Sequence, residues 1–127
     1  MNRILVVDDE PHVTRVLRLR LERAGYVVAT ALDGQAALAA IEQFPPDAVI
    51  TDIQMPRMSG RELCERIEEL FPHRTFPIFL LTSRAEVEHR EWSKKMPNAI
   101  FLEKPASIMR ILSELEDYFA AGQPVQH

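Results

Sequence analysis

Cysteine is nearly absent from this 127-residue chain. Cys64 stands alone, which excludes an intramolecular disulfide and a metal site built from several thiolates. Its spacing with Leu63, Ile67 and Leu70 predicts a thiol in the core. No apolar run approaches the roughly 20 residues that cross a membrane, and the N-terminal residues show no signal-peptide pattern. We therefore expect a cytoplasmic protein without a membrane span.

A large charge excess is also missing. The net charge of −4 gives no overall attraction to nucleic acid or to an anionic membrane, so direct DNA binding is not expected. One predicted helix is nevertheless locally basic, through Arg15, Arg18, Arg20 and Arg23. The histidines show neither metal-ligand spacing nor a nucleophile partner, and we expect them on the surface. They are His12, His73, His89 and His127.

The remaining composition, 46% hydrophobic and 27% charged, is typical of one globular domain, which we expect over residues 1–121 with a tail at 122–127. Apolar runs alternate with helical patterns, which predicts βα units and a parallel sheet in an α/β fold. Strands are expected at 3–7, 26–31, 48–51, 77–81 and 99–102. Helices are expected at 11–24, 35–44, 61–71, 84–96 and from 107 onward.

Apolar spacing predicts which side of the outer helices faces the core. In the first helix the expected inward residues are Val13, Val16, Leu17 and Leu21. In the last helix, which Ser107 is expected to cap, they are Ile108, Ile111, Leu112, Leu115 and Phe119. The segment 84–96 has few apolar residues, so we expect a lightly held helix that can shift.

Acidic residues follow two of the predicted strands. Asp52 ends the run that starts at Asp47, and Asp8 and Asp9 follow the first strand. Ligands of parallel α/β sheets bind beyond the carboxyl ends of the strands, so these three carboxylates should share one cleft. They would raise one another's pKa unless a cation neutralised them, and an all-oxygen site suits Mg²⁺. The sequence thus predicts Mg²⁺ beside a nucleophilic aspartate.

Two further strand ends carry the groups that phosphoryl transfer uses. Thr82 and Ser83 follow the fourth strand, and Lys104 follows the fifth. Phosphoryl transfer depends on positioning and charge neutralisation, and aspartate can be its covalent acceptor. Taken singly, each motif is more typical of a helix cap or a turn. The complete set, in this order, favours a site that carries a phosphoaspartate.

The residues Asp8-Asp9, Asp52, Met55-Pro56, Gly60, Thr82, Phe101 and Lys104-Pro105 together resemble the receiver domain of two-component response regulators. The resemblance extends over about residues 2 to 121. It implies a doubly wound (βα)5 flavodoxin-like three-layer sandwich with strand order 2-1-3-4-5. It also implies a domain that catalyses its own phosphorylation and slow dephosphorylation, and not a turnover enzyme.

The resemblance further implies specific roles. Asp52 would accept the phosphoryl group from a phosphohistidine of a sensor histidine kinase or a histidine phosphotransfer protein. Asp9, Asp52 and the backbone carbonyl of Gln54 would bind Mg²⁺, with Asp8 assisting through water. Lys104 would pair with the phosphate, on a cis peptide to Pro105.

Thr82 and Phe101 are the switch residues that the resemblance implies. Their movement would alter the surface of helix four, strand five and helix five, which a downstream protein or a fused output domain would read. Gln54 and Arg84 would flank the path of the hydrolytic water, and we hypothesise that Arg84 lengthens the phosphorylated lifetime.

Some residues depart from the family pattern. Residues 96–99 replace a small Gly-Ala pair, and Ala106 replaces an aromatic residue, so the common dimer through helices four and five is not assumed. A metal-dependent phosphatase with an aspartyl-phosphate intermediate is an alternative, but Gln54 stands where its second carboxylate would be. A phosphorylation-independent pseudo-receiver is another alternative. Whether the chain acts alone or as part of a longer regulator stays open.

Overall fold

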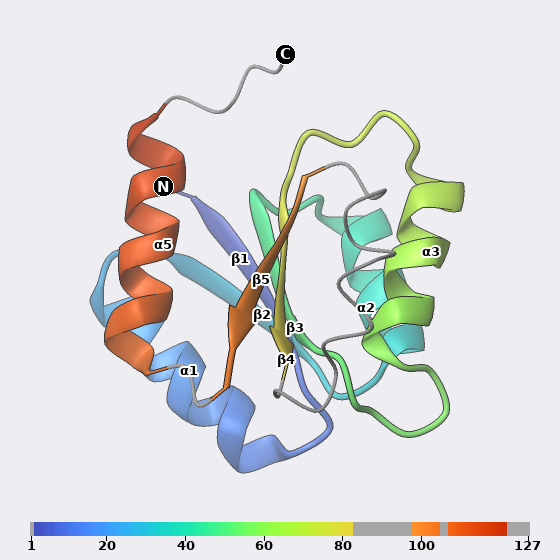
Figure 1. The fold of residues 1–127 in the computed structure, drawn as a ribbon, viewed down its shortest axis with the longest axis horizontal. Helices are drawn as coiled ribbons and strands as arrows, with labels where there is room; N and C mark the ends of the chain where they lie inside the picture. Colours follow the sequence, from blue (N-terminus) through green and yellow to red (C-terminus); the bar gives the residue numbers. More distant parts are fainter. Residues whose placement is uncertain (1, 83–97, 105–106, 122–127) are drawn as a thin grey trace.

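The computed structural model describes residues 2–82, 98–104 and 107–121, and the account below concerns these residues. A parallel sheet lies between two layers of helices (Figure 1), with strand order β2-β1-β3-β4-β5. The strands are β1 (Arg3–Val7), β2 (Val27–Ala31), β3 (Ala48–Asp52), β4 (Ile78–Thr82) and β5 (Ala99–Glu103). The helices are α1 (Pro11–Arg23), α2 (Gly34–Gln43), α3 (Gly60–Leu70) and α5 (Ile108–Ala120). The predicted fold class and strand order are confirmed.

The sheet buries both of its faces. Helices α2 and α3 cover one face, and α1 and α5 cover the other (Figure 1), each over its own hydrophobic cluster. All five residues of β3 and of β4 are buried. Near-continuous hydrophobic strands are typical of parallel sheets covered on two sides. This arrangement explains why these strands appear in the sequence as apolar runs without alternation.

Side-chain caps fix where three helices begin. The Asp33 carboxylate accepts a hydrogen bond from the amide of Ala36 at the start of α2. The hydroxyl of Ser107 accepts one from the amide of Arg110 at the start of α5, as predicted. At the start of α3, Ser59 forms a reciprocal capping box with the side chain of Glu62. These caps set the point at which the chain leaves the carboxyl edge of the sheet.

One prediction about inward-facing side chains was wrong. Val16 is 56% exposed, whereas Thr14 is buried on the inner side of α1. The Thr14 hydroxyl donates to the carbonyl of Pro11 at 2.9 Å, so its polar group is satisfied inside the helix and its burial costs little. Cys64 is fully buried, as predicted, and Leu70 at the end of α3 is 50% exposed.

Some predictions fall on residues outside the described ranges. They are the helix at 84–96, Ser83, Arg84, the Lys104-Pro105 peptide bond, Ala106 and the tail at 122–127. His12 and His73 are exposed, as predicted, and the other two histidines also lie outside these ranges.

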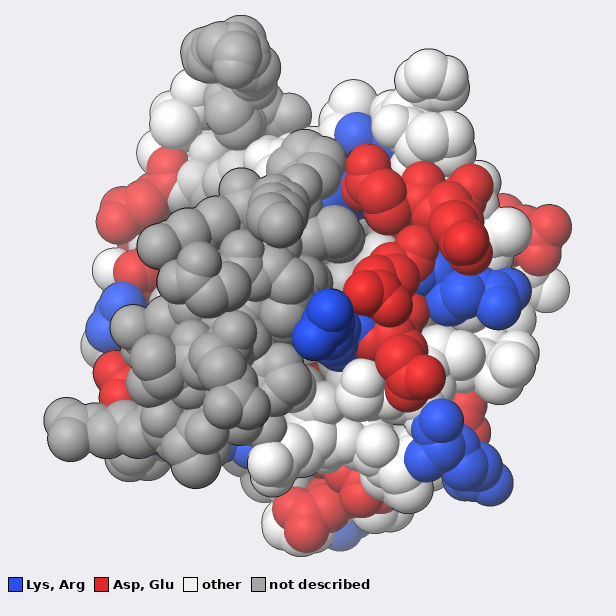
Figure 2. Space-filling view, turned by 45° about the vertical axis from the view of Figure 1, so that its right-hand side comes forward, with Lys and Arg blue, Asp and Glu red and all other residues white. Residues whose placement is uncertain are grey.

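The surface of α3 is strongly charged. Figure 2 turns this side of the molecule forward and shows acidic and basic side chains gathered over it. Arg61 pairs with Glu65 at 3.3 Å, and Arg66 pairs with Glu69 at 3.6 Å. This side of the described molecule is therefore a solvated, ion-paired face. Among the described helices, none has the length and apolar character needed to cross a bilayer.

Candidate functional site

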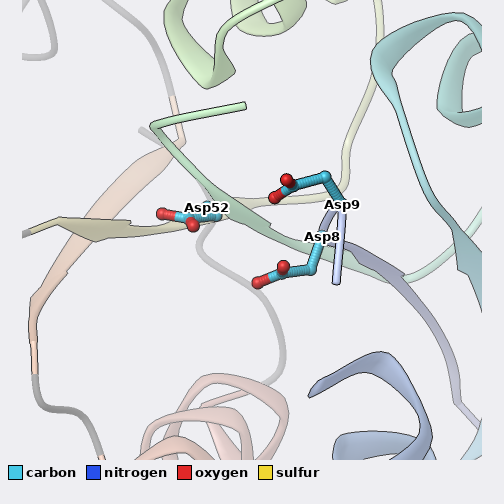
Figure 3. A group of neighbouring side chains, drawn as sticks. All are labelled: Asp8, Asp9 and Asp52. Atoms are coloured by element: carbon cyan, nitrogen blue, oxygen red, sulfur yellow. The ribbon is translucent and has the colours of Figure 1, made fainter. Parts of the chain in front are cut away.

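Three carboxylates meet at the carboxyl edge of the sheet. Asp52 is the last residue of β3, and Asp8 and Asp9 follow β1, its neighbour in the sheet. Figure 3 shows the side chains of all three projecting into the same space beyond the strand ends. One oxygen from each carboxylate lies within 4.8 Å of the others. The predicted acidic cluster is present, and its members come together because adjacent parallel strands end at the same edge.

Lys104 supplies the cation of this cluster. It follows β5, and its Nζ lies 2.9 Å from Oδ1 of Asp52. The Asp52 side chain is only 10% exposed, whereas that of Lys104 is 40% exposed. Burying a charged group is costly without an opposite charge or hydrogen bonds, and Lys104 supplies the opposite charge at Asp52. The amide of Gln54 also approaches the same Oδ1, at 3.4 Å.

Asp8 is the most perturbed acid of the site. Burial raises the pKa of its carboxyl above the ordinary value of 3.8, and the negative charges of Asp52 and Asp9 add to that rise. A hydrogen bond from the amide of Glu10, at 3.0 Å, and the charge of Lys104 act in the opposite direction. The three carboxylates thus carry more negative charge than the ammonium of Lys104 neutralises.

These acids fit a hard divalent cation. The donor set is made of carboxylate oxygens, which Mg²⁺ prefers, and the oxygens are close enough to share one ion. The raised pKa of Asp8 reports an electrostatic cost that a bound cation would relieve. The chemistry of the residues present therefore agrees with the predicted metal.

Position 60 requires glycine because it packs against the backbone of Asp52, the phosphoacceptor candidate. A Cβ at this position would lie 2.5 Å from the carbonyl oxygen of Asp52 and 2.7 Å from the Cα of Ile53. Such distances are well below van der Waals contact, and both obstacles are backbone atoms. The amide of Gly60 donates to the carbonyl of Ile53 at 2.7 Å. The start of α3 is thus seated against the backbone that carries Asp52.

The loop between β3 and α3 contains a residue whose role the sequence did not reveal. Arg57 has a φ of +69°, and the amide of Met58 donates to the carbonyl of Pro56 across it at 2.7 Å. This geometry is a γ-turn with a left-handed central residue, which is rare and strained for a side chain such as arginine. Its guanidinium lies 3.8 Å from the Asp33 carboxylate of the neighbouring loop. No sequence signal marks this turn, because glycine or asparagine would be the usual residue.

Thr82 lies on β4, which pairs with β3, and Phe101 lies on β5, one strand further out. Thr82 is 1% exposed. It is the last residue of β4, whereas the sequence predicted that it follows the strand. The amide of Lys104 donates to the carbonyl of Thr82, which ties the Lys104 backbone to the end of β4. Phe101 is half-buried against the cluster beneath α2 and α3. Gln54 is exposed at the rim, and Arg84 lies outside the described residues.

Comparisons with known proteins agree with this geometry. The sequence model of the response regulator receiver domain matches residues 4–116. The chain is 34% identical over 121 residues to an uncharacterized 14.6 kDa protein of Leptolyngbya boryana, covering 95% of this chain and 92% of that protein. It is 35% identical over 105 residues to the alkaline phosphatase synthesis transcriptional regulatory protein PhoP of Bacillus subtilis, covering 83% of this chain and 43% of that protein.

Solved structures show the same relationship. The chemotaxis protein CheY4 of Vibrio cholerae superposes with a TM-score of 0.84 at 31% identity, covering 92% of this chain and 98% of that one. A response regulator receiver domain protein of Clostridium thermocellum gives a TM-score of 0.84 at 26% identity, with 96% and 97% covered. The chain spans about half or less of the length of several regulators that it matches. With fold, site and sequence in agreement, the chain belongs to the response-regulator receiver domains, a family of signalling modules and not of turnover enzymes.

Proposed function

We propose that this domain accepts a phosphoryl group on Asp52 from a phosphohistidine of a sensor histidine kinase or a histidine phosphotransfer protein. The single observation that carries the proposal is the position of Lys104 Nζ, 2.9 Å from Asp52 Oδ1 at the centre of an acidic cluster. A nucleophilic carboxylate, a neutralising cation and a hard metal site are the parts that phosphoryl transfer requires. The family membership supports the same chemistry.

In the proposed step an oxygen of the Asp52 carboxylate attacks phosphorus. The bond between phosphorus and the imidazole nitrogen of the donor breaks, and the imidazole leaves with that electron pair. Asp52 becomes an acyl phosphate, and the ammonium of Lys104 can then pair with the new phosphoryl oxygens. Bound Mg²⁺, held by Asp9, Asp52 and the carbonyl of Gln54 with Asp8 nearby, would neutralise negative charge on the transferring group.

A hollow beside Asp52 supports the proposed donor. It has a volume of about 440 Å³ and opens between α1 and α5. Its polar end contains Asp8, Asp52 and Lys104, and its walls include the apolar side chains Val13, Val16, Leu17, Ile108 and Ile111. Val16 is exposed, and a partner helix that packs into the hollow would cover it. A protein donor suits this surface better than a small phosphate ester, which would leave the apolar walls in water.

We propose that Thr82 and Phe101 carry the response to phosphorylation. Phosphorylation adds about −1.5 to −2 charge and three acceptor oxygens near the buried end of β4, where Thr82 can donate to them. Movement of Thr82 would free space for Phe101, which is half-buried on β5, to turn inward. The altered surface formed by the predicted helix at 84–96, β5 and α5 would then control a downstream protein or a fused output domain. The two packings need differ by only a few kcal/mol.

We also propose that Gln54 and Arg84 tune the lifetime of the phosphorylated state. Each stands two residues beyond a reacting position, Gln54 after Asp52 and Arg84 after Thr82. Equal dephosphorylation rates for the native protein and Arg84→Ala would remove Arg84 from this role.

Intact mass after incubation with acetyl phosphate and Mg²⁺ tests the proposed transfer. We expect a single phosphate adduct, lost when Mg²⁺ is chelated and lost in Asp52→Asn, which keeps the shape of the side chain without its nucleophile. Folding of the variant is checked by circular dichroism. A folded native protein that forms no adduct, even when the reaction is quenched rapidly, would instead support a pseudo-receiver that binds partners without phosphorylation.

A further inference from the structure

The outer edge of β2 offers unpaired backbone groups. In the described part of the chain β2 has one strand neighbour, β1. The amide of Val27 donates to Asn2, and the carbonyl of Ala31 accepts from Asp8, so residues 27, 29 and 31 direct their backbone groups toward β1. Adjacent residues of a strand direct theirs to opposite sides. The amides and carbonyls of Val28 and Thr30 therefore point away from the sheet.

This edge lacks the features that usually prevent strand pairing. Natural edge strands are protected by charged residues, proline or bulges. The segment from Gly25 to Leu32 has no charged residue and no proline, and β2 itself is rich in β-branched side chains. It is also accessible, since Val27 is 43% exposed and Leu32 is 46% exposed. The outward amides and carbonyls of β2 can be satisfied by another extended backbone, so a partner at this edge would bind as a strand.

We propose that the β2 edge pairs with the β2 edge of a second copy of this chain, antiparallel and about a two-fold axis at Ala29. In that register Val28 of each copy faces Thr30 of the other. These are the residues with outward backbone groups, and each facing pair exchanges two hydrogen bonds. The two Ala29 residues form the intervening pair without hydrogen bonds, where Cα atoms lie about 4.5 Å apart and a small side chain fits.

Charge favours the antiparallel arrangement of two copies. Arg23 ends α1 just before β2, and Asp33 follows β2 as the cap of α2. An antiparallel pair brings the positive end of one β2 segment beside the negative end of the other. A parallel pair would bring like charges together. The β2 segment is therefore complementary to itself in the proposed orientation.

An apolar hollow next to the edge adds to the surface that pairing would cover. It has a volume of about 230 Å³, and its lining includes Val27, Ala29 and Phe44. Phe44 is 63% exposed, and the guanidinium of Arg3 lies 4.9 Å from the centroid of its ring. Val27 and Ala29 lie on the same face of the continuous sheet in both copies, so the two hollows would adjoin. The proposal uses no residue of the phosphorylation site and does not depend on the proposed function.

Disulfide trapping tests the register directly. In Ala29→Cys the introduced thiols of two copies would face each other at a separation that a disulfide can span, whereas in Val27→Cys they would be about 13 Å apart along the strands. Cys64 is fully buried and will not compete. With dissolved oxygen as the oxidant, we expect a covalent dimer of Ala29→Cys on non-reducing electrophoresis and little of Val27→Cys. Equal crosslinking of the two, or none in Ala29→Cys, overturns the proposal.

A backbone substitution provides a second readout. Thr30→Pro removes an amide that points away from the sheet, whereas Thr30→Val keeps the amide and the branched shape. Sedimentation velocity over micromolar to millimolar concentrations should show a reversible dimer for Thr30→Val. We expect dimerisation weakened by about tenfold or more in Thr30→Pro, since two of the four intermolecular bonds are lost. Equal dimerisation of folded variants, or a native chain that stays monomeric throughout, contradicts the pairing.

Discussion

At the scale of single residues, two glycines open helices but differ in what surrounds them. Gly34 begins α2 and Gly60 begins α3. A Cβ at Gly34 would meet the flexible side chain of Met58, whereas a Cβ at Gly60 would meet the backbone of Asp52 and Ile53. The first obstacle can move at small cost, and the second cannot move without displacing the phosphoacceptor candidate.

We therefore expect Gly60→Ala to lower the free energy of unfolding by roughly 1–3 kcal/mol, the usual cost of forcing extra atoms into a packed site. Its rate of phosphorylation should fall as well, because Asp52 is displaced. Urea denaturation and the acetyl phosphate reaction measure the two effects, with Gly34→Ala as the matched control. Similar behaviour of the two variants would contradict the special role of Gly60.

Cys64 provides a prediction about pH. Burial raises the pKa of its thiol from 9.0 to about 12. Between these values the unfolded chain loses the thiol proton while the folded chain keeps it, so stability falls as pH rises above 9. We expect the native protein to lose up to roughly 1.4 kcal/mol per pH unit more than Cys64→Ala in this range. Parallel denaturant titrations at several pH values measure the difference, and identical slopes would contradict it.

At the scale of elements, the start of α3 tests how firmly the site is held. Ser59 and Glu62 exchange hydrogen bonds at 3.1 and 3.0 Å in a capping box. Loss of such a cap leaves helix amides unsatisfied, and Ser59→Ala should lower the free energy of unfolding by about 1 kcal/mol. Ser113→Ala, at an exposed position inside α5, is the control and should be neutral or slightly stabilising. An unchanged midpoint for Ser59→Ala in urea would show that the box contributes nothing.

The elements were also where sequence reasoning was most reliable. Apolar runs ending at Val7 and Asp52 were identified as strands because a sheet covered on both faces needs continuous hydrophobic residues. The order of the strands was not deducible from any run and came from the family resemblance. Val16 was placed inward because it has apolar spacing, although it lines the hollow beside Asp52. A pattern of hydrophobic residues cannot separate a core position from one that a partner would cover.

Within the site, the acids and Lys104 were predictable because parallel strands bring their carboxyl ends to one edge. The contacts of Gly60 and the left-handed turn at Arg57 were not. Both depend on how the loop after β3 closes against neighbouring backbone, which no local residue preference encodes. Thr82 was predicted as a site residue, but its burial was not. It is buried because it is the last residue of β4, whereas the sequence placed it after the strand.

At the scale of the whole molecule, a divalent cation held by the acidic cluster would stabilise the folded state. A ligand that binds only the folded state stabilises it by RT ln(1 + [L]/Kd), about 2.7 kcal/mol at a hundredfold excess over Kd. We expect the midpoint of thermal unfolding to rise with Mg²⁺ concentration and the rise to be largely lost in Asp9→Asn. Monovalent salt at equal ionic strength is the control. An equal rise with that salt would indicate general screening and not a metal site.

The burial of β3 has a consequence for the timing of the proposed response. All five of its residues are buried, and β1 and β4 pair with it on either side. Amide protons in a strand of this kind are expected to exchange with solvent mainly through global unfolding. Asp52 is thus anchored at the end of a buried strand that is paired on both sides, while Lys104 is exposed just after β5. If Asp52 is phosphorylated as proposed, the response would begin with other groups moving toward a stationary aspartate, and its speed would be set by those groups and not by the strand.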